Sequence, residues 1–81
     1  MMKHCYIRLT EDLDLLHENR YIDVMLCENE DGVLMCHLSG IDDWELSFTG
    51  PEAEAKFNAL LDVSGEVPYD YILQLGFTQY G

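Results

Sequence analysis

Cysteine and histidine, the side chains that bind zinc and often serve as nucleophile and base, are scarce in this sequence. There are three cysteines, Cys5, Cys27 and Cys36, with His4 next to the first and His37 next to the last. Adjacent side chains of a strand point to opposite faces, so neither His–Cys pair directs both ligands at one ion. Free cysteines usually behave as small buried hydrophobic residues, and we expect this of Cys5 and Cys36. The sequence therefore predicts no bound metal and no cofactor.

No motif for catalysis occurs either. The chain has no G-x-S-x-G elbow, no phosphate-binding loop and no dinucleotide fingerprint. A calcium loop built around Gly32 would need ligands at Cys27 and Leu38, whose side chains cannot serve. Neighbouring carboxylates such as Asp42 and Asp43 can do acid–base chemistry, but a domain of this size leaves little room for a pocket. We predict a binding protein that is not an enzyme and has no catalytic residues.

Carboxylates are the abundant functional group. On a helix, Glu11, Asp14 and Glu18 would fall on one side. On a strand, Asp43 and Glu45 project the same way, roughly 6.6 Å apart. Carboxylates at such spacings can imitate the phosphates of a nucleic-acid backbone. The predicted partner-binding residues are Glu11, Asp12, Asp14, Glu18, Glu30, Asp31, Asp42, Asp43 and Glu45.

The overall charge restricts the class of partner. Sixteen Asp and Glu against four Lys and Arg give a net charge of −12 at pH 7. Neutralising phosphates requires clustered Lys and Arg, so direct binding to nucleic acid is not expected. A surface of this charge steers cationic partners, and we expect a basic protein surface, that of a nucleic-acid-binding protein or complex. The alternative is that the charge serves only solubility.

The cysteine count and the chain start predict the compartment. Three cysteines with no C-x-x-C spacing are typical of a reducing environment. Residues 1–4 lack the apolar core of a signal peptide, and no apolar run is long enough to span a membrane. We therefore expect a cytoplasmic protein, in the host cell if a phage encodes it.

Hydrophobic patterning predicts the elements that must position these carboxylates. Residues 3–9, 21–28, 33–39 and 44–49 show the period-two alternation of strands. Thr10 suits the start of a short helix ending near residues 17–20. In residues 52–62, Ala53, Phe57, Leu60 and Leu61 fall on one arc of a second helix, with Gly65 as its stop. After Pro68, alternating residues from Tyr69 to Phe77 favour a last strand that exposes Ile72.

The turn at residues 29–32 can be read in two ways. A two-residue loop at Asp31 and Gly32 pairs Cys27 with Cys36. A three-residue loop with Gly32 in the left-handed conformation shifts the pairing by one and places all the apolar residues of both strands on one face. We predict the longer loop. The order β-α-β-β-β-α-β then gives one α+β domain over residues 1–81, an antiparallel sheet of four to five strands with one or two helices on one face.

In size, charge and compact α+β character the chain resembles phage-encoded inhibitors that mimic DNA: uracil-DNA glycosylase inhibitor, anti-restriction proteins and several anti-CRISPR proteins. This resemblance rests on size and charge, and no residue role is transferred from it. It implies an anti-defence inhibitor. Separately, the sequence pattern marks Leu15, Ile72 and Tyr80 as candidate exposed apolar residues, which would either anchor a partner within the acidic surface or cover a neighbouring element or a dimer contact. The alternatives are an immunity protein or antitoxin against a basic nuclease, a small zinc protein, and a structural subunit that forms a homodimer.

Overall fold

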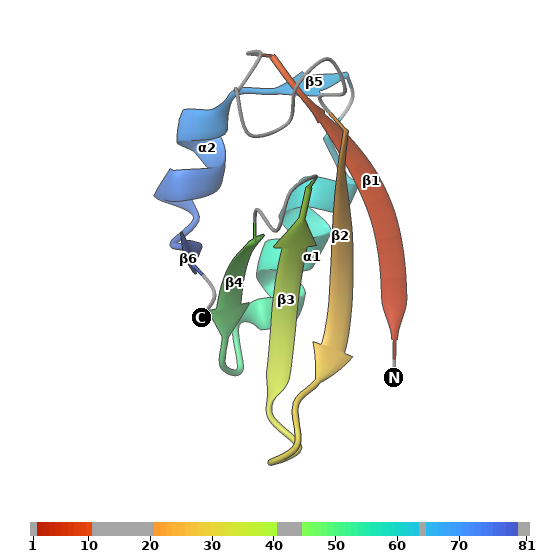
Figure 1. Ribbon diagram of the computed structural model, residues 1–81, viewed down its shortest axis with the longest axis vertical. Helices are drawn as coiled ribbons and strands as arrows, with labels where there is room; N and C mark the ends of the chain where they lie inside the picture. The colour runs from red at the N-terminus through yellow and green to blue at the C-terminus, as the bar shows by residue number, and fades with distance from the viewer. Residues whose placement is uncertain (1, 11–20, 41–44, 64, 80–81) are drawn as a thin grey trace.

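The computed structural model describes residues 2–10, 21–40, 45–63 and 65–79. Six strands form one curled sheet in the order β5-β1-β2-β3-β4-β6, and two helices accompany it (Figure 1). The predicted α+β class is confirmed. The prediction of an antiparallel sheet with four to five strands is wrong. Strand β5 pairs in parallel with β1, and β6 adds a further strand beyond β4. The elements are β1 (Lys3–Leu9), β2 (Tyr21–Glu28), β3 (Leu34–Ser39), β4 (Glu45–Thr49), α1 (Ala53–Leu61), β5 (Glu66–Val67), α2 (Tyr69–Gln74) and β6 (Thr78–Gln79).

The β2–β3 hairpin has the longer of the two loops considered. Glu28 pairs with Leu34, and beyond this pair the backbone N–H of Asn29 donates to the Val33 carbonyl, which leaves three residues, 30–32, in the loop. Gly32 has a φ of 76°, a left-handed conformation that glycine adopts without steric cost. The predicted register is therefore confirmed.

One face of the sheet carries the core, and α1 packs on that face against β1 to β4. Figure 1 shows α1 behind the central strands, so the opposite face of the sheet looks toward the viewer. The apolar side chains that alternate along the strands contact the helix on this face. Phe57 and Leu60 of α1 are buried against them. The fully buried strand residues are Leu9, Ile22, Val24, Leu26, Cys36 and Leu38.

The second predicted helix is confirmed with one residue misplaced. Ala53, Phe57 and Leu60 are buried, but Leu61 is 50% exposed. At 100° per residue, Phe57 and Leu60 lie within about 40° of Ala53 around the helix axis, whereas Leu61 lies about 80° away. The helix ends at Leu61, before the predicted stop at Gly65.

The predicted last strand is wrong. Residues Tyr69–Gln74 form helix α2, and only Thr78–Gln79 pair with the sheet. Ile72, expected on an exposed face, is 0% exposed, whereas Leu73 is 45% exposed. Tyr69, Ile72 and Leu75 are spaced three residues apart and pack in or against the core. The sequence of this segment therefore fits a helical spacing as well as the period of two from which the strand was predicted. The helix predicted to start at Thr10 would occupy residues 11–20, which lie outside the described residues, as do Trp44 and Tyr80.

Candidate functional site

A tightly hydrogen-bonded turn joins β2 to β3. The side-chain Oδ1 of Asn29 accepts hydrogen bonds from the backbone N–H of Asp31 at 2.9 Å and of Val33 at 3.0 Å. The backbone N–H of Gly32 donates to the Asn29 carbonyl at 2.9 Å, and the N–H of Asn29 donates to the Val33 carbonyl at 2.9 Å. These bonds fix the path of the chain through Glu30 and Asp31, two of the predicted partner-binding residues.

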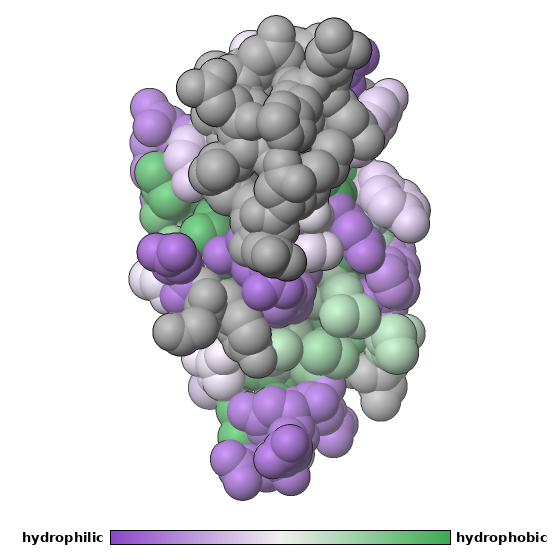
Figure 2. Space-filling view, in the orientation of Figure 1, coloured by the Kyte–Doolittle hydropathy of each residue, from purple (hydrophilic) through white to green (hydrophobic). Residues whose placement is uncertain are grey.

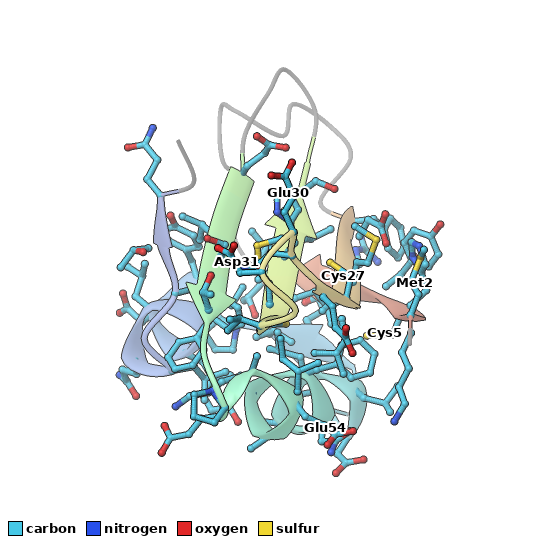
Figure 3. The ribbon with its side chains drawn as sticks, turned by 90° about the horizontal axis from the view of Figure 1, so that it is seen from below. Met2, Cys5, Cys27, Glu30, Asp31 and Glu54 are labelled. Atoms are coloured by element: carbon cyan, nitrogen blue, oxygen red, sulfur yellow. The ribbon has the colours of Figure 1, made fainter. Side chains whose placement is uncertain are left out.

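The turn presents a cluster of carboxylates at one end of the molecule. Glu28, Glu30 and Asp31 are exposed. We call these three residues the turn cluster. Within the described part of the chain, no ion pair joins any of them to Lys, Arg or His. Figure 2 shows the hydrophilic surface at the lower end of the molecule, and Figure 3, seen from that end, labels Glu30 and Asp31.

Glu45, another predicted site residue, lies at the other end of the sheet. It pairs with Ser39, five residues along β3 from the Leu34 that adjoins the turn, a distance of roughly 17 Å by strand rise. Its Oε1 accepts a hydrogen bond from Nε2 of His37 at 3.1 Å. The structure therefore separates Glu45 from the turn cluster. The remaining predicted residues, Glu11, Asp12, Asp14, Glu18, Asp42 and Asp43, lie outside the described residues.

The basic side chains in the described ranges are engaged within the molecule. Lys3 Nζ lies 3.5 Å from Oε2 of Glu54, and Arg8 Nε lies 3.4 Å from Oε2 of Glu66. The ammonium of Lys56 lies 5.2 Å from the centre of the Phe48 ring, a cation–π contact. Some carboxylates therefore form no ion pair with another described residue. Besides the turn cluster, these are Glu52, Asp62 and Asp70.

Two histidine–carboxylate pairs lie on the face of the sheet opposite α1, and sequence reasoning missed both. His4 Nδ1 lies 2.8 Å from Oδ1 of Asp23, and the second pair joins His37 to Glu45. Each pair is diagonal across neighbouring strands, since His4 lies directly opposite Met25 and His37 opposite Ser47. Finding them requires the register of β1 on β2 and of β3 on β4, which alternation within one strand does not supply.

The three cysteines divide between the two faces. Cys36 is buried in the core and Cys5 packs beside it, whereas Cys27 lies on the opposite face, level with Met35. Figure 3 shows Cys27 and Met2 on the side of the sheet away from α1. Burial raises the pKa of the Cys36 thiol to about 12, and burial together with the Asp23 carboxylate raises the pKa of Cys5. Both thiols therefore stay protonated near neutral pH, the form that is neither nucleophile nor metal ligand.

Among the residues that the structure describes, no three of His, Cys, Asp and Glu come close enough together to hold a metal ion. The helices of that part of the chain are also too short or too polar to cross a lipid bilayer. Comparisons with protein-family models, with curated proteins and with solved structures find no match to this chain.

Proposed function

We propose that this protein is a non-catalytic inhibitor that places its carboxylates on the cationic surface of a nucleic-acid-binding protein or complex. The observation that carries the proposal is the turn cluster, in which Glu28, Glu30 and Asp31 lie within four consecutive residues, are exposed and have no ion pair among the described residues. The resemblance in size and charge to phage-encoded inhibitors makes a host defence complex the kind of target we favour.

The rigidity of the turn supports this role. A flexible acidic segment loses conformational entropy when it binds, and that loss lowers its affinity. The Asn29 hydrogen bonds and the left-handed Gly32 hold the backbone of Glu30 and Asp31 before any partner arrives. The carboxylates are thus presented from a fixed frame, as the phosphates of a duplex are.

The density of charge is within about a factor of two of that of duplex DNA. A net charge of −12 along a long axis of 35 Å is one negative charge per about 3 Å, compared with about one per 1.7 Å along duplex DNA. The other predicted carboxylates belong to residues 11–20 and 41–44, outside the described part of the chain. The described residues that flank these two segments lie at the end of the sheet opposite the turn (Figure 1); they are Thr10, Tyr21, Gly40 and Glu45. Acidic sequence thus adjoins both ends of the long axis.

Affinity capture with two matched variants tests the proposal. The tagged protein is used to capture partners from a bacterial lysate, with and without excess duplex DNA or RNA as competitor. The first variant neutralises the turn cluster (Glu28→Gln, Glu30→Gln, Asp31→Asn). The control neutralises three unpaired carboxylates elsewhere (Glu52→Gln, Asp62→Asn, Asp70→Asn), so both variants carry the same net charge.

We expect a captured partner that binds nucleic acid and is displaced by the competitor. Loss of three surface charge contacts should weaken its binding roughly tenfold in the turn variant, while the control binds within a few-fold of the wild type. Equal losses in both variants would show that only total charge matters. Partners indifferent to nucleic acid and salt would refute the proposal.

A third variant addresses the segment between β1 and β2. Replacing Glu11, Asp14 and Glu18 with Gln, Asn and Gln removes three of the predicted partner-binding charges of that segment. If the partner also contacts this segment, this variant should bind roughly tenfold more weakly. If it binds like the wild type, the contact is confined to the turn cluster and to the side chains beside it.

A further inference from the structure

Strand β1 leaves part of its outer edge open. Along one edge it pairs with β2 over residues 3–8, but along the other edge β5 covers only Arg8 and Leu9. Figure 1 shows β1 as the outermost long strand, with β5 crossing near its upper end. Residues 3–7 therefore have no strand partner on that side within the described part of the chain. An open edge of this kind is a template for pairing with another strand.

The direction of the unpaired backbone groups follows from the pairing with β5. The backbone N–H of Thr10 donates to the Val67 carbonyl at 3.0 Å, so Thr10 directs its polar groups toward the β5 side. These directions alternate along a strand, and the N–H and C=O groups of His4 and Tyr6 therefore point out of the open edge. The Tyr6 side chain on this strand is 71% exposed.

The strand at this edge contributes no negative charge of its own to the acidic molecule. Residues 2–10 contain no Asp or Glu and include Lys3 and Arg8, two of the four Lys and Arg of the chain. Among the described residues, the carboxylates that contact side chains of β1 are each paired: Glu54 with Lys3, Glu66 with Arg8 and Asp23 with His4. Two copies that approach along β1 thus bring together surfaces on which these basic and acidic side chains are already paired.

We propose that two copies of this chain pair along β1 as an antiparallel, two-fold symmetric dimer centred on Cys5. Two-fold dimers are the commonest homo-oligomers, and their interface must be self-complementary. With the two-fold axis at Cys5, residues 3–7 of one copy pair with residues 7–3 of the other, so the whole open stretch is paired. A centre at Tyr6 would set Lys3 against Leu9, whose edge β5 already occupies. The inference does not depend on the function proposed above.

The Cys5-centred pairing sets specific residues against each other. His4 of one copy lies opposite Tyr6 of the other, and their outward-pointing backbone groups exchange hydrogen bonds. Cys5 faces Cys5 of the second copy as a pair without such bonds, with α-carbons about 4.5 Å apart. A disulfide needs a separation of about 4.4 to 6.8 Å, so this register brings the two thiols within bonding reach.

Disulfide cross-linking tests the register. In a Cys27→Ser background the folded protein is treated at mildly alkaline pH with diamide, which takes up the two electrons and two protons that the thiols release. We expect a disulfide-linked dimer on a non-reducing gel, and none when Cys5→Ser is added. Absence of the dimer, or a dimer that forms equally well without Cys5, would overturn the proposal.

Sedimentation velocity tests the edge without any covalent bond. The wild type should shift from one chain toward two as its concentration rises, and more so at high salt, which screens the repulsion between two acidic copies. Tyr6→Pro removes the outward N–H and should weaken the dimer roughly tenfold, while Tyr6→Thr keeps that N–H and should change it much less. A wild type that stays monomeric at every concentration and salt would contradict the proposal.

Circular dichroism shows whether the Tyr6→Pro protein is folded. If it is not folded, the disulfide cross-linking result alone tests the proposed dimer. The salt dependence also separates this dimer from the proposed function, since a contact between opposite charges weakens as salt is added. Failure of one therefore leaves the other standing.

Discussion

Cys36 shows how one buried side chain links packing to pH. It lies between Leu26 on β2 and Phe48 on β4, fully inside the core. Burial there raises the pKa of its thiol to about 12, because the core cannot solvate a thiolate. In the unfolded chain the pKa returns to an ordinary value near 9.

This difference predicts a loss of stability at alkaline pH. Between pH 9 and about 12 the unfolded chain releases the Cys36 proton while the folded protein keeps it, so the folded state loses relative stability as pH rises. The gap in unfolding free energy between wild type and Cys36→Ala should shrink by up to about 1.4 kcal/mol per pH unit above pH 9. Urea denaturation at pH 8, 9.5 and 10.5 measures it, and a constant gap would contradict the assigned burial.

Gly32 predicts a second residue-scale effect. An added Cβ would contact nothing within 4 Å, so the cost of a side chain there is conformational. With φ at 76°, Gly32→Ala should lower the unfolding free energy by about 1–2 kcal/mol, and Gly32→Asn by less, because asparagine tolerates the left-handed region. Equal losses in chemical denaturation of the two variants would show that the turn does not require this conformation.

At the scale of elements, two adjacent leucines of α1 provide a matched pair. Leu60 is 0% exposed, and Leu61 is 50% exposed. Leu60→Ala should therefore cost about 2–5 kcal/mol of unfolding free energy, and Leu61→Ala no more than about 0.5 kcal/mol. Thermal or urea unfolding of both variants measures the difference. Similar losses would mean that the helix buries a different face.

Elements whose signals are local could be predicted from the sequence. The β2–β3 hairpin followed from alternation on both strands and from one glycine that had to be left-handed, and its register was confirmed. The same reasoning failed after Pro68, where both a period of two and a spacing of three fitted the sequence. Packing of Ile72 into the core decided for the helix, and that packing depends on residues distant in the chain.

The candidate site divides in the same way. Glu30 and Asp31 could be placed because the turn that carries them is local, and the structure holds them in it by the Asn29 hydrogen bonds. The link between Glu45 and His37 could not be foreseen, because it needs the register of β3 on β4, and the sequence of the five-residue connection 40–44 does not match a turn type that would fix that register. Strands β5 and β6, of two residues each, are too short for any periodicity to predict.

At the scale of the whole molecule, charge should control stability. A net charge of −12 on a body whose longest axis is 35 Å opposes compaction. Raising NaCl from about 0.01 M to 1 M shortens the screening length from about 30 Å to about 3 Å, and we expect the melting temperature to rise by several degrees. The turn-cluster variant, with less repulsion, should rise less. A melting temperature that falls with salt would contradict this account of the charge.

The central claim is that the acidic surface takes the place of a nucleic acid on its partner, and mutual exclusion tests it most directly. The captured partner is mixed with a fluorescent duplex or guide RNA, and anisotropy is followed as this protein is added. The account predicts that the nucleic acid is released, that the turn-cluster variant needs roughly tenfold more protein, and that the equal-charge control behaves like the wild type. A ternary complex, with nucleic acid retained at saturating protein, would contradict it.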